Sequence, residues 1–206
     1  MTCLGVLQRL KQETRERHRA VEQHLNLPRR LKTNHDYLSL LARLYGFYMP
    51  MELRLNDVQG LGDLGLDLDS RRKTPLLVSD LLSLGVGPRA IAEIALCADL
   101  PEIADVSQAL GCLYVLEGAT LGGEVIGRDL ERRLGIQLDG GGRFFSSDGA
   151  NIAEKWKAFG EAITAHAGDA PSQNAIVASG CATFDAFGRW FQRETAPREL
   201  GYSAHA

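Results

Sequence analysis

The chain of 206 residues is 45% hydrophobic and 24% charged, which excludes a disordered polymer and favours one globular domain with a full core. Its formal net charge of −3, without a dominant stripe of Lys and Arg, argues against a nucleic-acid partner. The sequence has no run of about 18 apolar residues and no recognisable signal peptide, so we expect no membrane span and a cytoplasmic location.

The N-terminal part of the chain predicts two long helices. Apolar residues recur at three-, four- and seven-residue steps over residues 4–25, as on one face of a helix, and Pro28 follows the last turn. Thr33 and Asp36 have the spacing of a capping box, which predicts the start of the second helix. Pro50 lies within that second helix and should bend it, because proline removes one backbone donor.

The rest of the chain also predicts helices. Residues 57–73 are rich in Gly and Asp and predict a loop, and the next two helices begin at Thr74-Pro75 and Gly87-Pro88, with proline at the first helical position. A long helical segment follows over residues 101–134, which Gly135 is placed to end. A glycine-rich loop and two last helices are expected at 139–149, 151–167 and 171–194.

These elements define the expected fold class. No stretch alternates apolar and polar residues cleanly, so we find no convincing strand. Helices joined mostly by short loops predict an all-α, bundle-like single domain, which we place at residues 1–195. Residues 196–206 are expected to form a loose tail.

His18 is the first unusual residue of the predicted core. It is flanked by Arg17 and Arg19, yet it shares the apolar stripe of the first helix with Thr14 and Val21, so we expect it to face inward. From the residues alone, a buried histidine held by hydrogen bonds is the more common situation. A carboxylate at Glu22, one turn later, offers the alternative of a metal-binding histidine oriented by an acid.

The long segment is unusually rich in glycine for a helix. Each glycine inside a helix costs about 1 kcal/mol relative to alanine. Close packing between helices can explain such glycines, and so can a flat ligand that lies against bare backbone. No nucleotide-binding glycine motif is present. The glycines concerned are Gly111, Gly118, Gly122, Gly123 and Gly127.

At this point the sequence resembles the haem oxygenase family. Residues 13–18 (ETRERH), with Glu22, are similar to the family's proximal-helix motif, and residues 118–126 (GATLGGEVI) are similar to its distal-helix motif. Residues 114–118 (YVLEG) resemble the bacterial branch that makes biliverdin for bacteriophytochromes. Further agreement lies at 144–145, 151–153 and 155–157, so the resemblance covers most of the chain in the family's order.

The resemblance implies that haem b is both cofactor and substrate. Oxygen and electrons from a ferredoxin or a flavin reductase open the ring to biliverdin, carbon monoxide and ferrous iron, and a bacteriophytochrome would receive the biliverdin. His18 is the implied iron ligand, and Glu22 orients it. The other implied site residues are Lys11, Thr14, Tyr114, Gly118, Thr120, Gly122, Gly123, Lys157 and Phe184, with the two lysines placed at the propionates and Gly118, Thr120 and Gly122 on the oxygen side.

Two positions depart from the family pattern. Many members carry an aspartate that holds water after the first distal glycine, where this chain has Ala119, and Glu161 stands where relatives have an arginine for a propionate. Glu117 and Thr120 are the nearest polar candidates to replace the aspartate. A haem carrier or sensor with impaired turnover is therefore the alternative function. A third is an enzyme of the same architecture that uses a nucleophilic cysteine beside acidic residues, but no cysteine of this chain lies in an obvious acidic cluster.

Overall fold

The computed structural model describes residues 5–137, 139–146 and 151–193, and within these ranges all regular structure is helical. The all-α prediction is therefore confirmed. The tail expected from residue 196 on lies outside the described residues. The helices are α1 (Val6–Glu13), α2 (Arg15–Leu25), α3 (Leu27–Arg30), α4 (Asn34–Asn56), α5 (Thr74–Ser83), α6 (Pro88–Ala92), α7 (Val106–Leu121), α8 (Gly123–Leu134), α9 (Arg143–Ser146), α10 (Ile152–His166) and α11 (Ala170–Gln192), with 3₁₀ turns at Gly62–Leu64 and Asp69–Arg71.

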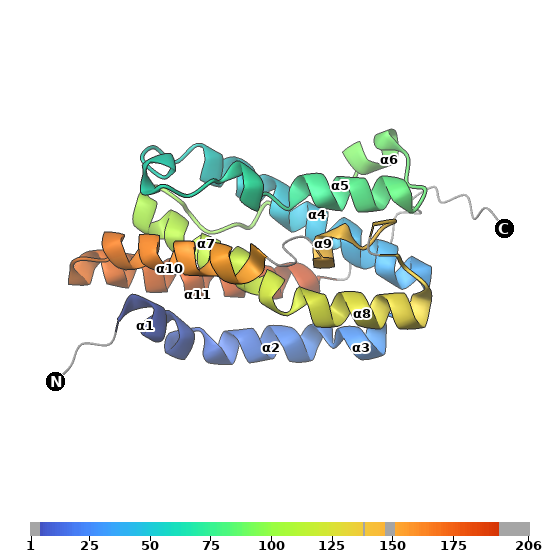
Figure 1. Cartoon of the computed structure of the whole chain (residues 1–206), viewed down its shortest axis with the longest axis horizontal. Coiled ribbons are helices and arrows are strands. Elements are labelled where there is room, and N and C mark those ends of the chain that lie inside the picture. The colour runs from blue at the N-terminus through green and yellow to red at the C-terminus, as the bar shows by residue number, and fades with distance from the viewer. Residues whose placement is uncertain (1–4, 138, 147–150, 194–206) are drawn as a thin grey trace.

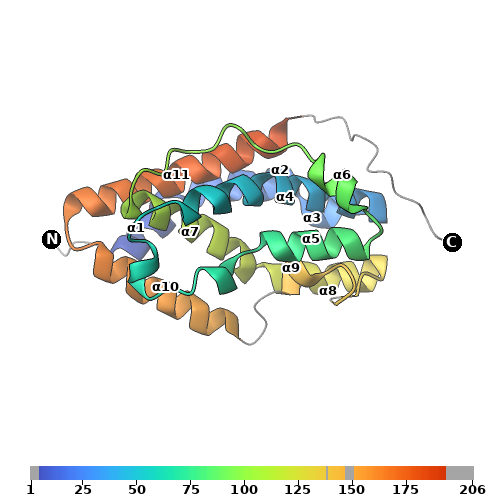
Figure 2. The ribbon, with the colours of Figure 1, turned by 90° about the horizontal axis from the view of Figure 1, so that it is seen from above.

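The helices form an elongated bundle in layers. Helices α1, α2 and α3 follow one another along one edge of the molecule, and α4, α5 and α6 lie along the opposite edge (Figure 1). Between these edges α11 packs along α7, and α10 contacts α1 and α7 (Figure 2). The short helix α9 packs on both α5 and α8. In the described ranges, none of the helices has both the length and the hydropathy required to cross a membrane.

The contact between α7 and α11 is the tightest in the core. A Cβ atom on Gly111 of α7 would lie 2.2 Å from the Ile176 carbonyl oxygen and 2.8 Å from the Gly180 backbone nitrogen of α11. A Cβ on Gly180 would in turn lie 2.9 Å from a methyl group of Leu10. Because a real Cβ atom does not approach backbone this closely, glycine is required for the two helices to approach each other.

The predicted first helix is divided once, and its predicted end near residue 25 is confirmed. Thr14 separates α1 from α2, and its hydroxyl donates a 2.6 Å hydrogen bond to the Leu10 carbonyl one turn earlier, a contact that bends helices. Asn26 adopts the left-handed conformation, with φ of 38°, and ends α2. We expected Pro28 to end the first helix, but it lies in the first turn of the short helix α3.

The other predicted boundaries agree more closely. The Thr33 and Asp36 capping box forms as expected at the start of α4, and Gly135, with φ of 67°, ends α8. The segment predicted as one helix over 101–134 begins only at Val106 and divides at Gly122 into α7 and α8. The glycine-rich loop predicted at 139–149 includes α9, which Asp80 anchors.

Candidate functional site

Helix α2 has an open face on the edge of the molecule (Figure 1). None of its residues is buried, and the His18 side chain is 53% exposed. The expectation that His18 faces inward is therefore wrong. Of the stripe that it shares with Thr14 and Val21, only Thr14 is buried and Val21 is half-buried. The periodic stripe is real, but α11 covers only part of it and leaves the imidazole accessible.

Two side chains hold the His18 imidazole. Its Nε2 lies 3.5 Å from a carboxylate oxygen of Glu22, one turn later on α2. Its ring is 5.5 Å from the ring of Phe184 on α11, measured between centroids, with the planes tilted by 54°. Glu22 can accept a hydrogen bond from one ring N–H, which leaves the other ring nitrogen to bind a metal ion. A metal-bound histidine usually makes such a hydrogen bond with its second nitrogen. The sequence thus correctly predicted that His18 and Glu22 lie together.

Thr14 and Tyr114 connect the start of α2 to α7. The Thr14 side chain is 2% exposed and hydrogen-bonds to the Tyr114 phenol. Burial raises the pKa of Tyr114, and the hydrogen bond with Thr14 offsets part of the rise, so the phenol stays protonated at neutral pH. The Tyr114 ring also lies 5.8 Å from the ring of Trp156 on α10. These contacts fix the position of α2 relative to the glycine-rich helix.

The glycines of α7 and α8 differ sharply in their surroundings. A Cβ atom on Gly118 or Gly122 would meet nothing within 4 Å, whereas one on Gly123 would lie 3.0 Å from the Phe145 carbonyl oxygen of α9. Gly118, Gly122 and Val125 follow at steps of four and three residues, so they lie on one face of the helical segment. Val125 is 74% exposed, which is unusual for a large apolar residue. None of the described side chains covers the backbone at Gly118 and Gly122, and accessible backbone of this kind fits a flat ligand.

Asp80 supports this helical face from behind, and the sequence analysis did not identify it. Its carboxylate is fully buried and accepts hydrogen bonds from the backbone N–H groups of Arg143 (2.9 Å) and Phe144 (2.8 Å) at the start of α9. Burial raises the pKa of Asp80, and these two hydrogen bonds lower it in part. Helix α9 in turn supplies the carbonyl oxygen against which Gly123 packs. The sequence signal that could have identified Asp80 is its position as an acid among the apolar residues of α5.

Glu117 does not face the open side of α7. It is 6% exposed, and its carboxylate lies 2.9 Å from Nη1 of the buried Arg71. A cavity of about 40 Å³, with room for a water molecule, lies next to this pair and is lined also by Tyr48, Glu52 and Lys73. The Nε atom of Arg71 is buried without a hydrogen-bond partner. Glu117 is therefore committed to the core and does not replace the missing aspartate from this position.

Thr120 is the remaining polar candidate near the distal glycines. Ala119 is exposed and presents only a methyl group. Thr120 belongs to α7, but its side chain lies outside the described part of the structure, so its predicted role stays a prediction. No described side chain is thereby assigned to the position that the family aspartate occupies.

Both predicted propionate lysines are exposed. Lys11 lies in the last turn of α1, seven residues, or about two helical turns, before His18. Lys157 of α10 lies 3.8 Å from Glu161, its neighbour one turn later, in an exposed ion pair. Lys157 and Glu161 line an open surface hollow together with Leu7 of α1. Lys157 thus lies on the α1–α10 side of the molecule. The Glu161 carboxylate beside it pairs with this lysine and would repel an anionic group.

The described donor set fits a porphyrin better than a bare metal ion. A structural metal held by protein alone needs about four ligands, and no group of three or more His, Cys, Asp or Glu side chains gathers in the described ranges. One accessible imidazole with a carboxylate beside it suits a porphyrin metal, since the macrocycle supplies the other four ligands. The bare face of α7 and α8 leaves room for a flat ring.

The three cysteines within residues 5–193 do not provide the nucleophile that the third functional alternative requires. Cys97 and Cys112 are buried and Cys181 is half-buried. Burial raises the pKa of each of these thiols, so none is an activated thiolate at neutral pH. The Cys112 sulfur instead contacts the hydroxyls of Ser179 and Thr183 inside the core.

The described residues form an all-helical domain in which the accessible His18 lies beside Glu22. The family model described as "Heme oxygenase" matches residues 4–193, and the chain belongs to the haem oxygenase family. This family degrades haem. The solved structure of the NO- and CO-bound haem oxygenase from Neisseria meningitidis is similar in fold, with a TM-score of 0.69, 17% identity, and coverage of 99% of this chain and 96% of that one. No curated protein sequence matches the chain significantly.

Proposed function

We propose that this chain opens the ring of haem b to give biliverdin, carbon monoxide and ferrous iron, with O₂ and electrons from a ferredoxin or a flavin reductase. One observation carries the proposal. The accessible His18, with Glu22 beside it, occurs in the same domain as the bare helical face at Gly118 and Gly122. Haem supplies the iron that activates O₂ and also the bridging carbon that is oxidised.

In this proposal, His18 binds the iron through one ring nitrogen. Glu22 accepts a hydrogen bond from the N–H of the other nitrogen and keeps the neutral imidazole oriented. Phe184 packs beside the imidazole and excludes water from that side. Thr14 and Tyr114 hold α2 at a fixed position relative to α7, so the ligand nitrogen keeps its direction.

The distal glycines have two different roles in the proposal. Gly118 and Gly122 let the backbone approach the oxygen side of the ring, because any side chain there would occupy the space. Gly123 lets α8 start close to α9, which keeps that backbone in place. The Thr120 hydroxyl would orient a proton-donating water on this side.

The charged groups are proposed to hold the two propionates. Lys11 is exposed and has no ion-pair partner among the described residues, so it is available to one propionate. Lys157 would exchange Glu161 for the second one, since an exposed pair of this kind contributes less than about 1 kcal/mol. The resemblance of residues 114–118 to the phytochrome-associated branch supports a bacteriophytochrome in the same cytoplasm as the recipient of biliverdin.

A haem carrier or sensor is the second candidate function. It is favoured by the absence of a carboxylate at Ala119 and by the commitment of Glu117 to Arg71. Without a group that delivers a proton on the oxygen side, the protein would bind haem and release it unchanged.

Haemin titration followed by reduction in air separates these functions. We expect a Soret band that decays into the absorption spectrum of biliverdin when ascorbate, or ferredoxin with its reductase, is added. A Soret band that persists under both reductants would support the carrier or sensor. A titration without a Soret band would refute both functions.

A further inference from the structure

The C-terminal end of α11 is held by side chains from two neighbouring helices. The last carbonyl groups of a helix have no partner within the helix, so they need donors from elsewhere. Arg43 of α4 donates to the carbonyls of Trp190 and Arg193. His24 of α2 lies with its Nε2 atom 3.2 Å from the Phe191 carbonyl oxygen. Because a carbonyl oxygen only accepts, Nε2 is the nitrogen that carries the hydrogen in this contact.

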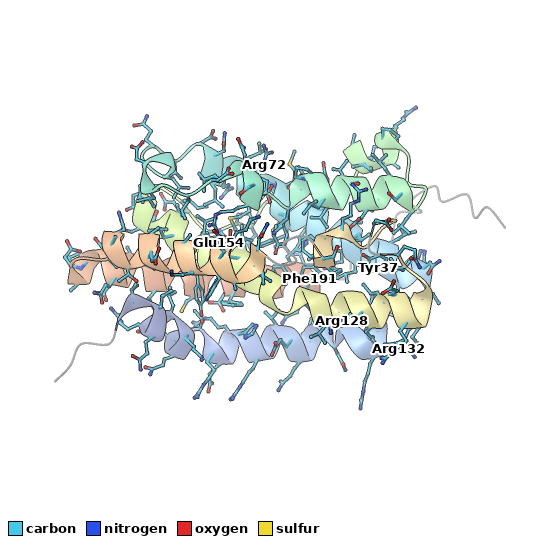
Figure 3. All side chains as sticks on the ribbon, viewed as in Figure 1. Tyr37, Arg72, Arg128, Arg132, Glu154 and Phe191 are labelled. Atoms are coloured by element: carbon cyan, nitrogen blue, oxygen red, sulfur yellow. The ribbon has the colours of Figure 1, made fainter. Side chains whose placement is uncertain are left out.

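The Phe191 carbonyl is an acceptor in a fixed position. The Trp190 indole N–H donates to the Arg43 carbonyl over 2.8 Å, so Arg43 and Trp190 hold each other through two hydrogen bonds. The Arg43 guanidinium also lies over the Phe191 ring, 5.0 Å from its centroid. The Phe191 side chain is buried and lies between the two edges of the bundle (Figure 3). His24 therefore attaches α2 to a part of α11 that α4 already holds.

Helices α2 and α11 run in the same direction along each other. Arg17 pairs with Asp185 at 3.0 Å, and His24, seven residues later, reaches Phe191, six residues after Asp185. The C-terminal ends of both helices therefore lie together. Carbonyl dipoles of the same sign meet there, and a side chain that donates a hydrogen bond relieves the repulsion. This geometry explains why a histidine is suited to the last turn of α2.

The second half of α2 has few other attachments. No residue of α2 is buried, and of its residues only Arg17 and His24 hydrogen-bond to another helix. The Arg17 ion pair with Asp185 lies in the first turn and is about half exposed, and such pairs contribute little. Val21 meets α11 at Gly188, which offers no side chain to pack against. His24 is therefore the main polar attachment of the end of α2.

His18 lies between two points at which α2 is held. Thr14 is four residues before it and His24 six residues after it, which corresponds to about 6 Å and 9 Å along the helix axis. The His18 imidazole is 53% exposed, and its described contacts are with Glu22 of the same helix and with the Phe184 ring. Since Glu22 moves together with α2, the direction of the imidazole depends on how α2 is held.

We propose that His24 is a positioning residue for the iron ligand. Its hydrogen bond to the Phe191 carbonyl fixes the end of α2, and thereby the direction in which the His18 imidazole points. The inference rests on the proposed haem oxygenase function, in which His18 binds the iron. His24 itself does not contact the haem in this account and acts only through the helix.

Three substitutions on α2 test this role. His24→Ala removes the donor, and because alanine has a higher helix propensity than histidine, a loss of function would not come from a weaker helix. His24→Gln keeps a side-chain amide that can donate to the same carbonyl, so it should behave as the original protein does. Gln23→Ala is the matched control, because it truncates the exposed neighbour on the same turn.

The first readout is amide hydrogen exchange in the haem-free full chain. We expect His24→Ala to accelerate exchange in the last turn of α2 about fivefold, the factor that corresponds to the loss of one hydrogen bond. His24→Gln and Gln23→Ala should stay within about twofold of the original protein. Unchanged exchange in His24→Ala, or equal acceleration in Gln23→Ala, would overturn the inference without affecting the proposed function.

The second readout concerns the iron ligand itself in the haem-loaded chain. We expect His24→Ala to shift or broaden the resonance Raman band of the ferrous iron–histidine stretch. Its rate of haem transfer to an excess of haem-free myoglobin should rise about fivefold. His24→Gln should restore both values. Faster exchange in α2 with an unchanged band and transfer rate would overturn the inference, because α2 would then be docked without positioning the ligand. An original protein that binds no haem would refute the proposed function, and the inference with it.

Discussion

The two halves of the glycine-rich segment show that one residue type can serve opposite purposes. At Gly111, the α7 backbone lies against the backbone of α11 and leaves no space for a methyl group. At Gly118 and Gly122, only two and three turns further on, a Cβ atom would meet nothing within 4 Å. The first half therefore uses glycine for packing, whereas Gly118 and Gly122 leave backbone accessible at the place where we propose that the ring lies.

Glu117 and Gly118 mark the border between these halves. Glu117 turns into the core toward Arg71, and the next residue belongs to the open face. Stability and ligand binding should therefore respond separately to substitutions on the two sides of this border.

The largest effect is expected in the packed half. A Val side chain in place of Gly111 would force α7 and α11 apart, because the atoms it meets are backbone. We expect Gly111→Val to lower the free energy of unfolding by about 3 kcal/mol or more, measured by urea denaturation. Stability equal to the original protein would mean that α7 and α11 do not approach as closely as described.

A smaller effect is expected at the border. Glu117→Gln leaves the buried charge of Arg71 without a counter-charge, and we expect a loss of about 2 kcal/mol in the free energy of unfolding. Glu161→Gln is the matched control, since that carboxylate belongs to an exposed pair and its loss should cost less than about 0.5 kcal/mol. Equal losses in the two variants would contradict the assignment of Glu117 to the core.

The open half should respond in ligand binding and not in stability. Gly118→Ala adds a methyl group in free space and improves helix propensity, so we expect the free energy of unfolding to stay the same or to rise by up to about 1 kcal/mol. Haem titration of the same variant should show weaker binding or a shifted Soret band. Unchanged haem binding would mean that the ring does not lie against Gly118.

The smallest effect concerns pH and the start of α4. Burial raises the pKa of Asp36, but hydrogen bonds from Lys32 and Thr33 outweigh this and lower the pKa below 3.8 overall. A lowered folded-state pKa stabilises the protein above the unfolded pKa, and this contribution is lost as the pH falls through the folded one. We expect Asp36→Asn to cost about 1 kcal/mol at neutral pH and the two proteins to converge in acid, with haem binding unchanged.

Local signals in the sequence predicted the fold better than they predicted the site. The capping box at Thr33 and the final Gly135 were predictable because each is decided by neighbours in the chain. The exposure of His18 was not, because a helical stripe does not reveal which helix covers it. The pairing of Glu117 with Arg71 and the support of α9 by Asp80 depend on contacts between segments that are distant in the chain. The sequence does not show how such segments align with one another.

The most direct test of the account is a haemin titration of the original protein, His18→Ala and His35→Ala. His35 is exposed at the start of α4 and serves as the control histidine. We predict that His35→Ala gives the Soret band of the original protein, and that His18→Ala loses this band and regains it when imidazole is added. A His18→Ala variant that titrates as the original protein does would contradict the assignment of the iron ligand, and with it the proposed site.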